Sequence, residues 1–225
     1  MVSRTDNPFY QPYFAVRLMV LVAVMALTNW AFLPTQTMLN LVAEGGPVEN
    51  ATVVFYYLAI IGVWLFRPPS VGMPTALALH IVMFDMAARE LDLHKRLTGM
   101  SLLKLRFWTG STPVSAKLIA ALILLPLALS LVYLVRTYGR RWLAALKRRS
   151  PVAISATTFF ATLVISKLSD RSLGAIKETI GWVGPDWLVA LQQSIEEPFE
   201  MMLPLLILLT VLQARRNAPA AVSAY

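Results

Sequence analysis

Residues 14–33 read FAVRLMVLVAVMALTNWAFL, a run of twenty residues in which Arg17 is the only charged side chain. About 20 consecutive apolar residues are enough for a helix to cross the hydrocarbon core of a bilayer. The run lacks the small-residue cleavage site of a secretory signal peptide. We therefore interpret it as a first membrane span that is retained in the mature protein.

The composition of the whole chain extends this interpretation. Of the 225 residues, 57% are hydrophobic and 14% are charged, whereas a typical soluble domain is about 25% charged. The chain contains no cysteine, which excludes disulfides, thiolate metal sites and cysteine nucleophiles. We expect an all-α fold in which residues 1–225 form a single integral membrane domain, a polytopic transmembrane helical bundle.

Six apolar runs are predicted to span the membrane. They cover about residues 14–33, 51–66, 74–94, 115–135, 151–169 and 195–214. The outer loop between the third and fourth runs contains SLLKLRFW, residues 101–108. Its mixture of aromatic, aliphatic and basic residues is typical of a short interfacial helix that lies in the headgroup layer.

Charge distribution predicts the orientation of these spans. Six spans place both termini on one side, and Lys and Arg are retained on the cytoplasmic side. With the N-terminus inside, that side holds eleven of the 20 basic residues, namely Arg4, Arg17, Arg67, Arg136, Arg140, Arg141, Lys147, Arg148, Arg149, Arg215 and Arg216. We expect an N-in, C-in protein of a bacterial inner (cytoplasmic) membrane. The net charge of +8 is then explained by basic residues retained on the cytoplasmic side. We expect the lipid bilayer as a partner and no nucleic-acid partner.

The third predicted span continues directly into the charged stretch AARELDLHKR, residues 87–96. Residues 74–98 include neither glycine nor a second proline, so they predict one uninterrupted helix. Its i,i+4 pairs would be Asp85–Arg89, Glu90–His94 and Asp92–Arg96. Such pairs stabilise exposed helices by about 0.2–0.5 kcal/mol each. An acid at the bilayer centre costs about 2.5–3.5 kcal/mol, so pairing alone does not account for Asp85.

The fifth predicted span carries hydroxyl groups on one helix face and then runs into KLSDR, residues 167–171. The hydroxyl stripe consists of Ser155, Thr158, Thr162, Ser166 and Ser169. Hydroxyl groups at this spacing favour either close helix packing or one wall of a hydrated cavity.

The sixth predicted span begins with QQSIEEPFEMMLPLL, residues 192–206. Glu196, Glu197 and Glu200 fall within one sector of its helical wheel. Pro198 and Pro204 each remove a backbone donor and favour distortion of the helix.

The outer membrane boundary is predicted to be shared by Glu90 and His94, by Lys167 and Asp170, and by EEPFE at residues 196–200, whereas Asp85 is expected near mid-depth and His80 in the inner half. Carboxylates and imidazoles that converge there can act as acid/base groups or hold a divalent metal. The candidate catalytic residues are Asp85, Glu90, His94, Glu197 and Glu200. The overlapping candidate metal ligands are His80, Asp85, Glu90, His94, Glu197 and Glu200. The candidates for binding an anionic headgroup are Lys167 and Arg171.

Three functions fit these patterns. The first is a metal-dependent or acid/base enzyme that acts on a lipid or lipid-linked substrate. The second is a small proton- or cation-coupled transporter, expected to form a homo-oligomer. The third is a non-catalytic subunit or assembly factor of a membrane complex. The sequence contains neither an HExxH zinc motif nor a glycine-rich nucleotide loop.

Overall fold

The structure is a computed structural model that describes residues 7–43, 45–69, 71–99, 102 and 105–217, without the side chains of residues 94, 95 and 98. These residues form helices and connecting segments, with no strand among them. The helices are η1 (Pro8–Tyr10), α1 (Phe14–Phe32), α2 (Thr35–Leu41), α3 (Pro47–Phe66), α4 (Met73–Glu90), α5 (Leu93–Thr98), α6 (Leu105–Thr109), α7 (Val114–Lys147), α8 (Pro151–Ile180) and α9 (Asp186–Asn217). The all-α prediction is confirmed.

Four helices, α1, α3, α7 and α8, are long and apolar enough to cross a membrane. Their large apolar side chains face outward, with Leu122 and Val135 of α7 exposed by 75% and 70%. Such extended apolar surfaces are typical of helices that face lipid. The prediction of a helical membrane protein is thus confirmed at four of the six predicted spans.

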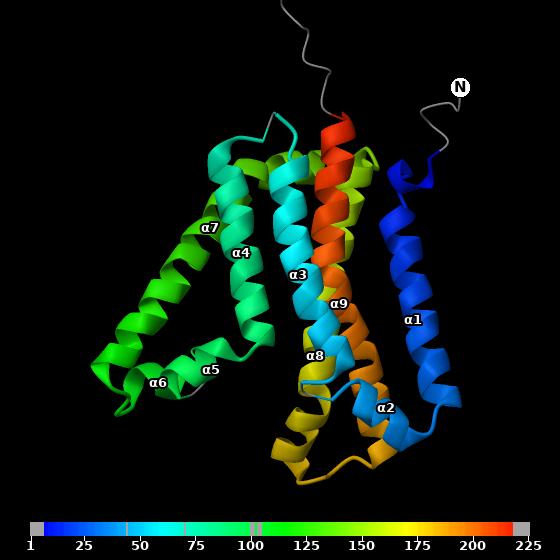
Figure 1. Ribbon diagram of the computed structural model, residues 1–225, viewed down its shortest axis with the longest axis vertical. Helices are drawn as coiled ribbons and strands as arrows, with labels where there is room; N and C mark the ends of the chain where they lie inside the picture. The colour runs from blue at the N-terminus through cyan, green and yellow to red at the C-terminus, as the bar shows by residue number, and fades with distance from the viewer. Residues whose placement is uncertain (1–6, 44, 70, 100–101, 103–104, 218–225) are drawn as a thin grey trace, which may run out of the picture.

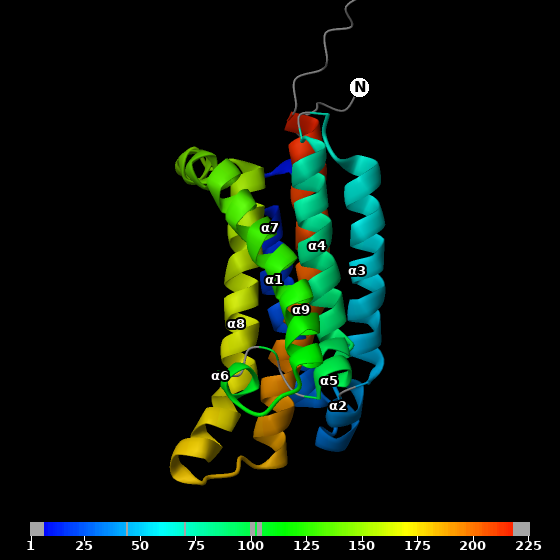
Figure 2. The same ribbon diagram turned by 90° about the vertical axis from the view of Figure 1, so that its left-hand side faces the viewer.

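The helices α1, α3, α4, α8 and α9 run alongside one another, and α7 is inclined to them (Figure 1). α9 is the central element, because it packs against α8, α3, α1 and α2. At Gly62 of α3 a Cβ atom would come within 2.6 Å of Leu208 Cδ1 on α9, so glycine permits this close approach. The start of α1 and the end of α9 lie at the same end of the bundle (Figure 1; Figure 2).

The uninterrupted helix predicted over residues 74–98 is wrong. α4 ends at Glu90, and Asp92 adopts a positive φ of 50° before α5 begins at Leu93. Aspartate is one of the few residue types that enter this left-handed region at modest cost. The turn directs α5 towards α7, with which it packs. Glu90 and residue 94 therefore do not lie on one continuous helix, and the predicted Glu90–His94 pair loses its basis.

Three other helices extend well beyond the predicted spans. α7 continues from 135 to Lys147, α8 from 169 to Ile180, and α9 starts at Asp186 rather than near 195. α8 ends where Gly181 takes a positive φ of 73° and caps the helix. The extensions mix charged or polar residues with apolar ones, so the apolar-run criterion does not detect them.

The predicted interfacial segment is partly described, since residues 101, 103 and 104 lie outside the described residues. Its helical part is α6, and Phe107 is fully buried against Ala116 and Ala120 of α7. Trp108 Nε1 donates a hydrogen bond of 2.9 Å to the Leu102 carbonyl. The segment is thus folded against α7, and its position in the headgroup layer stays a prediction.

Candidate functional site

A network of ion pairs joins α4, α8 and α9. Arg89, in the last turn of α4, donates from one nitrogen, Nη2, to Glu90 Oε1 and to Glu200 Oε2, both at 2.9 Å. Glu90 is its neighbour on α4, whereas Glu200 lies on α9, 111 residues further along the chain. Arg89 therefore connects two carboxylates from separate helices.

The opposite oxygen of Glu200 is bonded from α8. Ser166 Oγ donates to Glu200 Oε1 at 2.7 Å, and Lys167 Nζ forms an ion pair with the same oxygen. Lys167 also lies 3.7 Å from Asp170 Oδ2, one turn further along α8. Glu200 is consequently held between two cations, one on each oxygen. Charge-assisted bonds of this kind are about twice as strong as neutral ones.

Burial within the network is unequal. The side chains of Glu90 and Glu200 are 6% and 5% exposed, while those of Arg89 and Lys167 are 38% and 32% exposed. The carboxylates thus lie inside the bundle, and the two cations reach its surface beside them.

Acids outnumber bases around Glu200. Glu196 and Glu197 are half-buried on the same helix, and both interact electrostatically with Glu200. Together with Asp170, Glu90 and Glu200 they make five carboxyl groups near two cations. Among the described residues of this cluster, carboxyl groups therefore outnumber the cations that pair with them.

The packing of α3 explains why α4 and α9 can share this network. α3 packs against both helices, and it places Tyr56 beside Met83 and Ala87 of α4. The Tyr56 side chain is fully buried, and its hydroxyl has no hydrogen-bond partner among the described residues. The charges of Glu90, Arg89 and Glu200 act on this hydroxyl. It is a buried polar group within electrostatic range of the network.

Of the predicted candidates, Glu90, Glu200 and Lys167 come together in the network, and Glu197 lies beside it. Arg171 is exposed on α8, one turn beyond Lys167. Asp85 is half-buried one turn before Arg89, and this residue is also engaged in an interaction. The side chain of His94 lies outside the described residues.

His80 belongs to a different part of the bundle. Its Nδ1 lies 2.6 Å from the Ala76 carbonyl oxygen and its Nε2 lies 3.1 Å from the Ile60 carbonyl oxygen. Trp64 packs edge-on against the imidazole ring. With both ring nitrogens directed at backbone carbonyls, His80 connects α3 to α4 and is not a member of the ion-pair network.

The predicted metal ligands do not assemble in the described part of the chain. No group of three or more His, Asp or Glu side chains is arranged there to hold a metal ion. In the network, the oxygens of Glu90 and Glu200 are instead directed at cations. Hydrogen-bonded ammonium and guanidinium groups occupy the positions where a divalent ion would need free oxygen ligands.

The hydroxyl stripe of α8 faces α9. Ser155, Thr158, Thr162 and Ser166 are all buried. Ser155 Oγ donates to Gln213 Oε1 of α9 at 2.8 Å, and Thr158 Oγ1 donates to the Ile154 carbonyl of its own helix at 2.9 Å. Small hydroxyl side chains allow the two helices to approach and bond. The stripe therefore contributes to helix packing and, through Ser166, to the network.

Sequence reasoning missed the central position of Arg89, which the i,i+4 rule assigned to Asp85. It also did not select Ser166, Asp170, Glu196 or Tyr56 as site residues. Ser166 next to Lys167 on the buried face of α8 was the available signal, because a hydroxyl stripe that ends in a charge predicts a polar contact on the neighbouring helix. Nothing in the local sequence distinguishes Tyr56 from an ordinary core tyrosine.

The chain matches no protein-family model, and we found no similar curated protein and no similar solved structure. Functional roles are therefore assigned from the geometry of the network itself.

Proposed function

We propose that the protein is a multi-pass membrane enzyme that acts on a lipid or lipid-linked substrate by acid/base chemistry at Glu90 and Glu200. The observation that carries this proposal is the convergence of the two buried carboxylates on Arg89, with Lys167 at the other oxygen of Glu200. Carboxyl groups fixed in this way are positioned for proton transfer to and from a bound substrate.

The six-span, N-in and C-in arrangement belongs to the same proposal. α4 and α9 would join the four apolar helices as spans, since both run alongside them (Figure 1). From 198 to 214, α9 contains Glu200 as its one charged residue. Arg67 follows the end of α3, and Arg215 lies in the last turn of α9 at the same end of the bundle. These basic residues support a cytoplasmic position for that end. The network then lies in the outer half of the bilayer.

The cations suggest how the substrate is held. Arg89 and Lys167 are partly exposed beside the carboxylates, and Arg171 is exposed one turn further out on α8. In this proposal Lys167 and Arg171 bind an anionic group of the substrate, and Arg89 keeps Glu90 and Glu200 in position. Tyr56 supplies a buried hydroxyl that can donate to a bound polar group.

The test is the lipid profile of cells in which the chromosomal gene carries Glu90→Gln or Glu200→Gln. We expect both variants to accumulate the same lipid species as a deletion strain, because an amide cannot exchange the proton; general acid/base groups contribute about 10²–10⁴-fold to rate. Glu178→Gln, which changes an exposed carboxylate on α8, is the matched control and should leave the profile unchanged. A wild-type lipid profile in both variants, at wild-type protein levels in the membrane, would refute the proposal.

A second candidate, a proton-coupled carrier, is favoured by one observation. Ion pairs across α4, α8 and α9 surround an excess of carboxyl groups, so proton uptake would weaken contacts between helices. Reconstituted vesicles distinguish the two functions. A pH-driven flux that is lost in Glu200→Gln, together with unchanged lipids in cells, would favour the carrier.

A further inference from the structure

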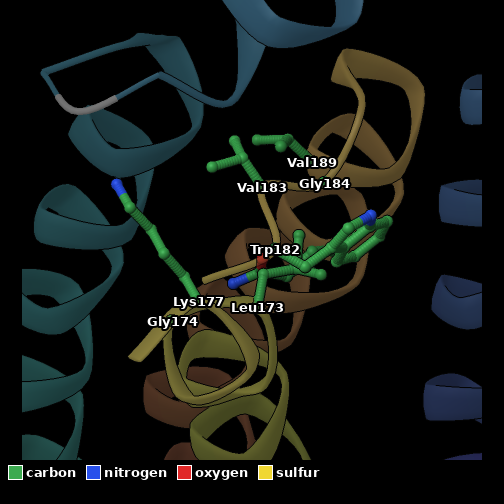
Figure 3. Close-up of a pocket in the computed structure, with 8 residues that line it drawn as sticks. Leu173, Gly174, Lys177, Trp182, Val183, Gly184 and Val189 are labelled. Carbon is green, nitrogen blue, oxygen red and sulfur yellow. The ribbon is translucent and has the colours of Figure 1, made fainter. Parts of the chain in front are cut away.

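A second feature, a mainly apolar pocket, lies at the outer end of the α8–α9 hairpin, away from the ion-pair network. A pocket of about 210 Å³ is lined by the last turns of α8 and the start of α9. Its walls include Leu173, Gly174, Trp182 and Val183, and its polar groups come from Lys177 and Gln192. In Figure 3 the Lys177 side chain extends along one side of the pocket and Trp182 lies on the other, with Val183 between them.

The pocket is built on a well-bonded scaffold. Gln192 Nε2 donates to the Asp170 carbonyl at 3.0 Å, and Ser169 Oγ donates to the Gln192 carbonyl at 3.2 Å. Gly181 closes α8 through its backbone N–H to the Lys177 carbonyl at 3.0 Å. These bonds hold the hairpin in one arrangement, so the pocket is defined by the fold.

The depth of the pocket follows from the length of α8. The helix has 30 residues, or about 45 Å at 1.5 Å per residue, and the hydrocarbon core of a bilayer is about 30 Å thick. Gly174 and Lys177 lie roughly 35–39 Å along the axis from Pro151. If α8 enters the hydrocarbon near its first turn, the pocket is level with the opposite headgroups. Lys177 is also about 15 Å beyond Lys167 along the helix, which makes the pocket a separate site.

The exposed residues around the pocket are of the types expected at the level of the lipid headgroups. Trp182 and Trp187 are 43% and 52% exposed, and Val183 is 67% exposed. Tryptophan is enriched where headgroups meet hydrocarbon, because the indole ring has an apolar body and one polar group. Apolar walls with a single ammonium group suit a molecule that is apolar over most of its length and carries one negative charge.

We propose that this pocket binds an anionic phospholipid, with the lipid phosphate on Lys177 and the first part of an acyl chain against Trp182 and Val183. Lysine binds phosphate as a point charge. The site extends beyond the proposed enzyme function, because none of its lining residues belongs to the carboxylate network. It would fix one lipid at the outer end of the hairpin.

The chain offers two complementary variants. Lys177→Gln removes the charge and keeps the polar side chain. Gly174→Leu adds an apolar side chain at a pocket-lining position, and no atom lies within 4 Å of the added Cβ. It also replaces a helical glycine, which favours the helix. Arg148→Gln, an exposed charge beyond the end of α7, is the control.

The experiment is a titration of the purified full-length protein with phosphatidylglycerol or phosphatidylcholine in detergent, followed by native mass spectrometry. We expect one phosphatidylglycerol to be retained in preference to phosphatidylcholine, and its apparent affinity to fall about tenfold in Lys177→Gln and in Gly174→Leu. Arg148→Gln should bind like the wild type. Three results would overturn the inference. The wild type could retain the two lipids equally, or both pocket variants could retain phosphatidylglycerol as the wild type does. The third result is displacement of the lipid by 10 mM inorganic phosphate at roughly equimolar lipid. Because Glu200→Gln should retain the lipid, failure here is distinct from failure of the proposed enzyme function.

Discussion

Replacement of Arg89 by glutamine is expected to lower the free energy of unfolding by about 3 kcal/mol, within the range for removal of one partner of a buried ion pair. The remaining partners are buried, since Glu90 and Glu200 are 6% and 5% exposed. The loss lies at the lower end of the range because Arg89 itself is 38% exposed and Glu200 keeps its pair with Lys167. Thermal or chemical unfolding of the purified protein in detergent measures the change.

Two further variants make this result specific to the network. Arg89→Gln combined with Glu90→Gln should recover part of the lost stability, because one unpaired carboxylate is removed. Arg140→Gln, an exposed residue on α7, should change the free energy of unfolding by no more than about 0.5 kcal/mol. A loss in Arg89→Gln as small as that in Arg140→Gln would contradict the burial of the pair.

Glu200→Lys is expected to have the largest effect of any single substitution in the site. It places a third cation between Arg89 and Lys167, which in the wild type both bond to the Glu200 carboxylate. The cost should exceed roughly 4 kcal/mol, which is exceptional for one substitution and reflects like charges held in a partly buried space. We expect little folded protein in the membrane, measured as the monodisperse fraction on size-exclusion chromatography.

A second change tests whether position rather than charge alone matters. Lys167→Glu in the Glu200→Lys background reverses the pair and should restore a substantial part of the monodisperse fraction. Lys147→Glu, which supplies the same charge change at the exposed end of α7, should restore none. Equal rescue by both changes would mean that net charge, and not the contact between α8 and α9, limits folding.

The sequence was informative where burial of charge is costly. Glu90 and Glu200 could be selected because each follows or enters an apolar stretch where solvent should be excluded, and the structure brings both to Arg89. Lys167 could be selected because it is a cation directly after Ser166 of the hydroxyl stripe of α8. These residues are recognisable from their place along the predicted spans, without knowledge of how the helices pack.

Other features depend on tertiary packing and could not be predicted. Spacing within one helix identifies only i,i+4 partners, so it paired Arg89 with Asp85. It could not identify Glu200 as a partner of Arg89, because that contact forms only when α3 packs against both α4 and α9. The break at Asp92 has no glycine or proline to mark it and accompanies the packing of α5 on α7. His80 was grouped with the acids by residue type, yet it bonds to backbone carbonyls of α3 and α4.

The most direct test of the account is a double-mutant cycle between Arg89 and Glu200. The free energies of unfolding of the wild type, Arg89→Gln, Glu200→Gln and the double variant give the coupling between the two side chains. A bonded, charged pair with one buried partner should couple by about 1.5–3 kcal/mol. Losses that add to within about 0.5 kcal/mol would show that α4 and α9 do not share this contact, and the proposed site would lose its basis.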